Sequence, residues 1–207
     1  MTKRIARTLV FGIALVAGTT ASGLSALAQT KSPAPKPAET AGEVAPRGSQ
    51  RLDKLFEKLR EAENANAAKV VAADIERALE RSGSATADLL YTRAKEAMAA
   101  RDFDLAIDML DYVISLRPGW AEPYHRRAII HFVRKDQDAA FRDVRETLAR
   151  EPRHYHALAG LGGILKGLGD NKGAFKAFSR ALEIYPHFSD LRDSVEKMRP
   201  EVEGQPI

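Results

Sequence analysis

The sequence has 207 residues, of which 44% are hydrophobic and 29% are charged, and it contains no cysteine. This composition is typical of a soluble folded protein of one or two domains. The absence of cysteine excludes disulfides, a lipid-modified cysteine anchor, thiolate metal sites and cysteine nucleophiles. The formal net charge is +4, but three of the 32 basic residues lie in the first 28 residues, so 29 basic residues face 28 acidic ones in the rest. A chain so close to neutrality argues against nucleic-acid binding.

The first 28 residues have the pattern of a secretory signal peptide. Lys3, Arg4 and Arg7 precede a ten-residue apolar run at 9–18, and the segment closes on an A-x-A motif that ends at Ala28. This order predicts cleavage between Ala28 and Gln29. An uncleaved membrane anchor is the alternative, but a span needs about 20 apolar residues. We therefore expect no stable membrane span after cleavage, and export suggests a bacterial periplasmic protein.

Two segments precede the regular part of the chain. Residues 29–50 contain four prolines among small and polar residues, and only Val44 is a sizeable apolar residue, so we expect a disordered tether. Residues 51–84 hold two stretches with the i, i+3, i+4 periodicity of amphipathic helices. We interpret 51–84 as a degenerate repeat or helical hairpin that caps the N-terminal end of the array that follows. A free coiled coil is the alternative, but the run is too short for three or four heptads.

Four kinds of residue recur every 34 residues in the stretch that follows. They are Pro118, Pro152 and Pro186; Asp102, Asp136 and Asp170; Ala106, Ala140 and Ala174; and the small residues Ala94, Ala128 and Gly162. A period of this length indicates an array of identical helical units. The prolines are expected to end each second helix, the aspartates to cap it, and the small residues to lie where two helices cross closely.

These units resemble the tetratricopeptide repeat, a helix–turn–helix of about 34 residues. The third unit carries the best match, with Leu158, Leu161, Gly162, Leu165, Ala174, Phe178, Ala181 and Pro186. The second unit departs from the pattern at Arg127, His131 and Val144, where leucine and aromatic residues are usual. The resemblance implies an all-α, right-handed solenoid with repeats at 87–118, 121–152 and 155–186 inside a domain at 85–199. A capping helix from Phe188 to Met198 is expected to end at Pro200, followed by a fraying tail at 200–207.

No arrangement of residues in the sequence indicates catalysis, a cofactor or a metal. His154 and His156 are two apart, and His125 and His131 are six apart, so neither pair shares a helix face. We expect no carboxylate among them at zinc-ligand spacing. The G-x-S-x-G motif is absent, and the paired carboxylates fall in turns or on helix surfaces. We therefore expect a protein that is not an enzyme and needs no cofactor.

The resemblance also implies a binding surface, because in such proteins the first helix of each repeat lines a concave groove that binds a peptide or a partner's helix. The residues expected there are Tyr91, Lys95, Met98, His125, Arg126, Ile129, Phe132, His156, Ala159, Gly163 and Lys166. An apolar centre with basic flanks favours a peptide that carries a carboxylate. The family's clamp for a terminal carboxylate also uses asparagines, which are absent from these helices.

Compartment and fold together suggest a periplasmic adaptor that recruits an envelope protein or peptide, in cell-envelope integrity or assembly. This inference is an analogy from the fold. The alternative is an accessory subunit in peptidoglycan or polysaccharide metabolism, in which Tyr91, Trp120, Tyr124 and Phe132 would stack on sugars. Self-association through the terminal helices is a third reading.

Overall fold

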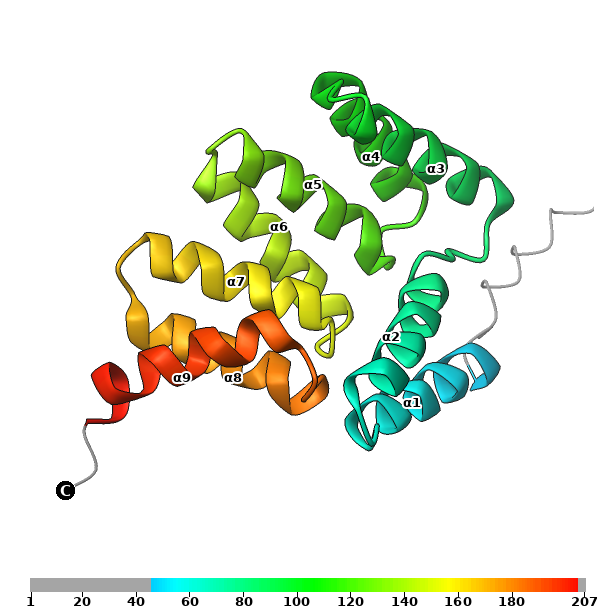
Figure 1. The fold of residues 1–207 in the computed structure, drawn as a ribbon. Coiled ribbons are helices and arrows are strands. Elements are labelled where there is room, and N and C mark those ends of the chain that lie inside the picture. Colours follow the sequence, from blue (N-terminus) through cyan, green and yellow to red (C-terminus); the bar gives the residue numbers. More distant parts are fainter. Residues whose placement is uncertain (1–45, 205–207) are drawn as a thin grey trace, which may run out of the picture. The chain divides into compact units, whose positions relative to one another are not determined.

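The computed structural model describes residues 46–204, and the regular secondary structure in this range is helical throughout (Figure 1). The predicted signal peptide, its cleavage site and residues 29–45 of the predicted tether lie outside the described residues. The helices are α1 (Pro46–Arg60), α2 (Ala65–Leu79), α3 (Ala85–Ala99), α4 (Phe103–Leu116), α5 (Ala121–Val133), α6 (Gln137–Arg150), α7 (Tyr155–Gly167), α8 (Asn171–Ile184) and α9 (Ser189–Glu203). The predicted all-α repeat architecture is confirmed, with α3–α4, α5–α6 and α7–α8 as the three repeats.

In each repeat the predicted aspartate caps the second helix. Its side-chain oxygen accepts a hydrogen bond from the backbone N–H three residues further on, as a capping aspartate does. The pairs are Asp102 with Leu105 at 3.3 Å, Asp136 with Ala139 at 3.0 Å and Asp170 with Gly173 at 2.8 Å. The second helices end at Leu116, Arg150 and Ile184, each two residues before its proline. Both predictions from the 34-residue spacing are confirmed.

A further position in the turns recurs at the same spacing. Arg101, Lys135 and Gly169 each precede the capping aspartate, and all three have a positive φ, of 62°, 63° and 81°. Only glycine adopts this left-handed region without strain. The turn therefore imposes the same backbone on two residues that disfavour it, which a comparison of residue types does not reveal.

Small residues bring the two helices of each repeat close together. Ala94, Ala106, Ala140 and Ala174 are fully buried. Gly162 on α7 lies against the ring of Phe178 on α8, where an added Cβ would stand only 2.3 Å from the ring carbon Cε1. These positions set how closely the axes approach.

The α1–α2 hairpin is present, but its buried face does not simply cover the first repeat. Phe56, Leu59 and Ile75 of the hairpin belong to the same hydrophobic core as Tyr155 and Phe178 of the third repeat. The ring of His187 contacts the Ala62 carbonyl at 2.8 Å. The cap that was expected at the N-terminal end of the array therefore shares its core with the C-terminal repeat.

Both ends of the helical region differ from the boundaries expected from the sequence. Helix α1 begins at Pro46, so residues 46–50 are helical and do not belong to a tether. Helix α9 continues through Pro200, which was expected to end it, and runs to Glu203. Val202 packs against the core, and this contact favours continuing the helix past the one hydrogen bond that proline cannot make. Within residues 46–204, no helix has both the length and the apolar character required to cross a membrane.

Candidate functional site

A pocket of about 510 Å³ lies between the first helices of the second and third repeats and α2. Its lining includes seven of the eleven residues expected in the groove, among them His125, Arg126, Ile129, Phe132 and His156. Ala159 and Gly163 also line it. The first helices α5 and α7 therefore form a common recess, as the resemblance implied.

The remaining expected groove residues lie elsewhere. Tyr91 and Lys95 on α3 contact the pocket-lining helix α2 through Glu80, at 3.5 and 2.8 Å. Met98 packs into the core between α3 and α4. Lys166 is exposed and is not part of the pocket lining. The recess thus draws mainly on the second and third repeats.

One wall of the pocket is apolar and accessible. Ile129 and Phe132 on α5 keep 36% and 52% of their surface exposed and lie one turn apart on the helix. Gly160 and Gly163 on α7 leave open space around their Cα atoms. The missing side chains on α7 make room beside the two large ones on α5.

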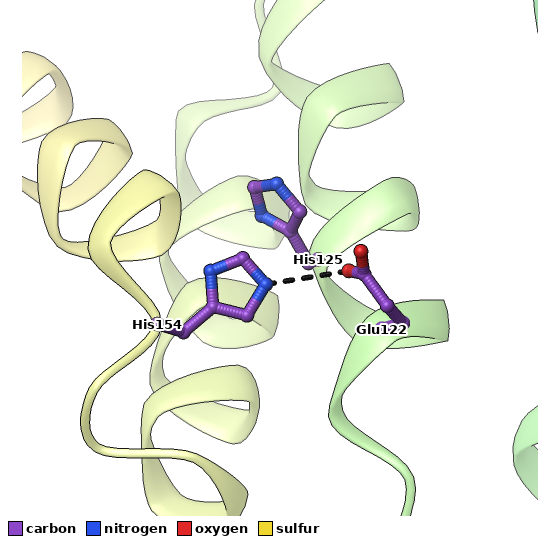
Figure 2. A group of neighbouring side chains, drawn as sticks. All are labelled: Glu122, His125 and His154. Atoms are coloured by element: carbon purple, nitrogen blue, oxygen red, sulfur yellow. Dashed lines mark hydrogen bonds and ion pairs between the residues drawn. The ribbon is translucent and has the colours of Figure 1, made fainter. Parts of the chain in front are cut away.

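The polar part of the pocket is a buried cluster of Glu122, His125 and His154 (Figure 2). His154 caps α7: its Nδ1 accepts a hydrogen bond from the N–H of Ala157 at 3.1 Å. Because Nδ1 accepts, the ring proton is on Nε2, which faces Glu122 Oε2 at 3.3 Å and donates to it. The cluster therefore joins the start of α7 to the first turn of α5.

Burial and charge shift two of these groups in the same direction. Burial lowers the pKa of His125 to about 3, so its imidazole is neutral at pH 7. Burial alone would raise the pKa of Glu122, but the hydrogen bond from His154 and the nearby Arg126 contribute to lowering it to about 2. At neutral pH the cluster holds a carboxylate beside a neutral imidazole.

The cluster has the composition of a metal site, which the spacing argument overlooked. Glu122 is three residues before His125, on the same face of α5, and the fold adds His154, so that one ligand atom of each lies within 4.8 Å of the others. His125 Nδ1 is buried and has no hydrogen-bond partner within the described residues. The hydrogen bonds of His154, however, occupy both of its ring nitrogens. In this form the cluster offers two ligands, fewer than the three or four protein ligands of zinc sites.

The predicted cationic flanks of the groove are already paired with α2. Glu80 accepts hydrogen bonds from Lys95 Nζ at 2.8 Å and from Arg126 Nη2 at 2.9 Å. Arg126 Nε also donates to the hydroxyl of Tyr91 at 2.9 Å. The sequence predicted that these cations would face a peptide carrying a carboxylate. In the structure they face Glu80, at the C-terminal end of a helix of the same chain.

Three of the four aromatic residues proposed for sugar stacking are buried. Tyr91, Trp120 and Tyr124 keep no more than 9% of their surface exposed. The indole N–H of Trp120 donates to the Leu79 carbonyl at 2.7 Å. Phe132 alone of the four is accessible, so the aromatic argument for glycan binding fails.

Tandem helix pairs with a recess along their first helices define a helical-repeat protein. No protein-family model matches the chain. A TPR repeat-containing protein from Rhizobium etli is 35% identical over 155 residues, which cover 75% of this chain and 76% of that relative. The chain belongs to the family of tetratricopeptide repeat proteins. The small glutamine-rich tetratricopeptide repeat-containing protein 2 of Saccharomyces cerevisiae is 29% identical over 100 residues, 48% of this chain and 29% of the yeast protein.

Solved structures agree with this fold. The first TPR domain of Spaghetti (RPAP3), bound to the HSP90 peptide SRMEEVD, has a TM-score of 0.53 at 20% identity over 56% of this chain and 93% of its own. The Yersinia enterocolitica type III secretion chaperone SycD, in complex with a peptide of the translocator YopD, has 0.52 at 15% identity, over 58% and 94%. MamA has 0.53 at 20% identity, over 77% and 86%. These similarities are to the fold.

Proposed function

We propose that this protein is a non-enzymatic scaffold that recruits a protein partner through the pocket between α2, α5 and α7. The observation that carries the proposal is the accessible apolar wall of this pocket, where Ile129 and Phe132 stand beside two glycines of α7. Large apolar side chains held open beside a recess are typical of sites that take an anchor residue of a partner. Two proteins with the same fold are described with bound peptides, which supports this use of the repeats.

The proposed site of action is the bacterial periplasm, and the proposed process is cell-envelope integrity or assembly. The support is the order of basic residues, apolar run and A-x-A motif in the first 28 residues. A fusion of these residues to a reporter that is active only after export tests the location. Retention of the reporter inside the cell would contradict it.

The partner proposal is tested by affinity capture from envelope extracts with a pocket variant, Ile129→Ser/Phe132→Ser. We expect at least one protein that the wild type captures to be lost from this variant. The matched control is Leu105→Ser/Leu116→Ser, which removes two apolar side chains of similar exposure, 43% and 41%, from α4 outside the pocket. Equal capture by all three proteins would contradict recruitment through the pocket.

A further inference from the structure

We propose that α2 is an internal ligand of the concave groove, and that the groove recognises a partner helix with the same chemistry, two carboxylates four residues apart beside an aliphatic residue. This inference rests on the proposed function and names the class of partner. It starts from one face of α2. Ala72, Glu76, Leu79 and Glu80 lie at positions i, i+4, i+7 and i+8 and so share that face.

The groups that contact this face come from all three repeats. From the first repeat, Lys95 and Tyr91 donate to Glu80. From the second, Arg126 donates to Glu80, and Trp120, just before α5, donates to the Leu79 carbonyl. Four of these donors therefore converge on the last turn of α2 and its C-cap.

The third repeat binds the preceding turn of the same face. The hydroxyl of Tyr155 donates to Glu76 at 3.1 Å and lies 3.5 Å from the Ala72 carbonyl oxygen. The Nε2 of His156 lies 3.1 Å from Glu76. Tyr91, Lys95, Arg126 and His156 are groups that the sequence placed on the ligand-binding surface. The occupant of that surface is the carboxylate-bearing face of an amphipathic helix of the same chain.

The contacts at Glu76 and Glu80 can be exchanged for equal ones. The side chains of Glu80, Lys95 and Arg126 are between 26% and 36% exposed, so their ion pairs are in contact with water and contribute little beside the apolar packing of Ala72 and Ile75 that also holds α2. After the C-cap Glu80, residues 81–84 join α2 to α3, and Gly83 among them has a φ of 76°. To replace α2, a partner helix must present the same two carboxylates together with an apolar face like that of Ala72 and Ile75, with this connection as the hinge.

Tethering gives α2 an advantage over a free helix, because a short connection acts as an effective concentration of about millimolar. Weakening α2 must therefore strengthen the binding of an added helix. The probe is a labelled peptide with the sequence of residues 64–82, titrated by fluorescence anisotropy into the intact chain. We expect Glu76→Gln/Glu80→Gln in the protein to bind this peptide at least about tenfold more tightly than the wild type does.

Three controls separate this mechanism from general charge effects. Glu57→Gln/Asp74→Asn removes two carboxylates of the same hairpin that do not contact the groove residues, and it should bind the peptide as weakly as the wild type. The Glu76→Gln/Glu80→Gln variant is called the opened protein, and a peptide with glutamine at positions 76 and 80 should not bind it. Adding Lys95→Glu/Arg126→Glu to the opened protein should abolish binding of the original peptide. Thermal unfolding of each variant checks that it is folded.

Displacement is measured directly with spin labels at Val70→Cys on α2 and Leu168→Cys after α7, because both positions are exposed and the chain has no other cysteine. We expect the distance between the labels to increase when the peptide saturates the opened protein. Equal affinity of the wild type, the opened protein and the charge control would overturn the inference, as would an unchanged distance at saturation. In either case, loss of a captured protein from the Ile129→Ser/Phe132→Ser variant would still support the proposed function.

Discussion

Single small residues decide how closely the helices of a repeat approach one another. At Gly162 the ring of Phe178 occupies the space that a Cβ would need. At Gly160, two residues earlier on α7, nothing lies within 4 Å of the same position. A side chain at position 162 would therefore clash with Phe178, whereas a side chain at position 160 has room.

We expect Gly162→Ala to destabilise the protein. The overpacking costs about 1–3 kcal/mol, and the better helix propensity of alanine offsets about 1 kcal/mol of that cost. Gly160→Ala has the propensity gain without the clash and should raise stability. Urea unfolding of both variants measures the difference. Equal stability of Gly162→Ala and Gly160→Ala would contradict the close contact between Gly162 and the ring of Phe178.

We expect two buried groups, Glu122 and His125, to make stability depend on pH. The folded state holds the pKa of His125 at about 3, whereas an unfolded histidine titrates near its ordinary 6.5. Between these values the unfolded state binds a proton that the folded state does not, so falling pH favours unfolding. Glu122, with its pKa lowered from 4.5 to about 2, adds a second loss of stability below pH 4.5.

We expect the free energy of unfolding to fall by up to roughly 1.4 kcal/mol for each pH unit between pH 6.5 and 4.5 on account of His125. His125→Leu removes this proton uptake and also a buried nitrogen without a partner, so it should be at least as stable as the wild type at pH 7.5. Chemical unfolding at pH 7.5 and 5.0 compares the two proteins. A variant with the full pH dependence of the wild type would show that another group is responsible.

At the scale of elements, the second repeat replaces usual apolar contacts with a polar network. Arg127 on α5 donates through Nε and Nη2 to both oxygens of Asp143 on α6, at 2.8 and 2.7 Å, and also pairs with Asp111 on α4. His131 lies 3.7 Å from Asp143. Asp143 is only 5% exposed, so these partners replace most of its contact with water. The departures from the family pattern at Arg127 and His131 are thus two parts of one network.

We expect Arg127→Leu, which restores the family's usual residue, to destabilise the protein by about 3 kcal/mol, because it leaves the Asp143 carboxylate buried with one weak partner. The double variant Arg127→Leu/Asp143→Leu removes both charges and should recover most of the loss. Thermal unfolding of the single and double variants forms the test. A double variant no more stable than Arg127→Leu would contradict the dependence of one residue on the other.

At the scale of the whole described region, the buried hydrophobic residues form separate clusters. The order of residues in the sequence does not show which residues share a cluster. The first repeat forms one cluster together with Trp120 and Ile130, and other residues of the second repeat form a smaller one with Ile164. The hairpin shares a third cluster with α7, α8 and α9. Residues more than 100 positions apart, such as Phe56 and Phe178, therefore belong to one core.

We expect Ile75→Ala, which removes a fully buried side chain of α2, to cost about 2–5 kcal/mol. Hydrogen exchange should quicken in α8 as well as in α2, because the two helices share a core. Val70→Ala is the control, since Val70 lies on the same helix but is 65% exposed. Faster exchange confined to α1 and α2 would show that the hairpin is independent of the third repeat.

The sequence by itself determined the repeat, because its features act locally. Each of these features depends on neighbours within one repeat: capping at Asp102, the end of the helix before Pro118, and close packing at Ala106. Their 34-residue spacing therefore predicts three helix pairs. The resemblance to the tetratricopeptide repeat implied that the first helices share a surface, and seven of the expected residues line the pocket. The continuation of α9 through Pro200 was missed, because the contact of Val202 with the core outweighs the local signal.

Only the tertiary structure decided what occupies the groove. The amphipathic pattern of α2 shows that one face is buried, but the identity of the surface that covers it depends on contacts made across the chain. The sequence predicted Lys95 and Arg126 as cations available to a partner, but in the structure both are paired with Glu80. The buried cluster likewise needs His154 from one repeat beside Glu122 from another. Hydrogen bonds and ion pairs between distant residues leave no periodic trace, and these contacts define the site.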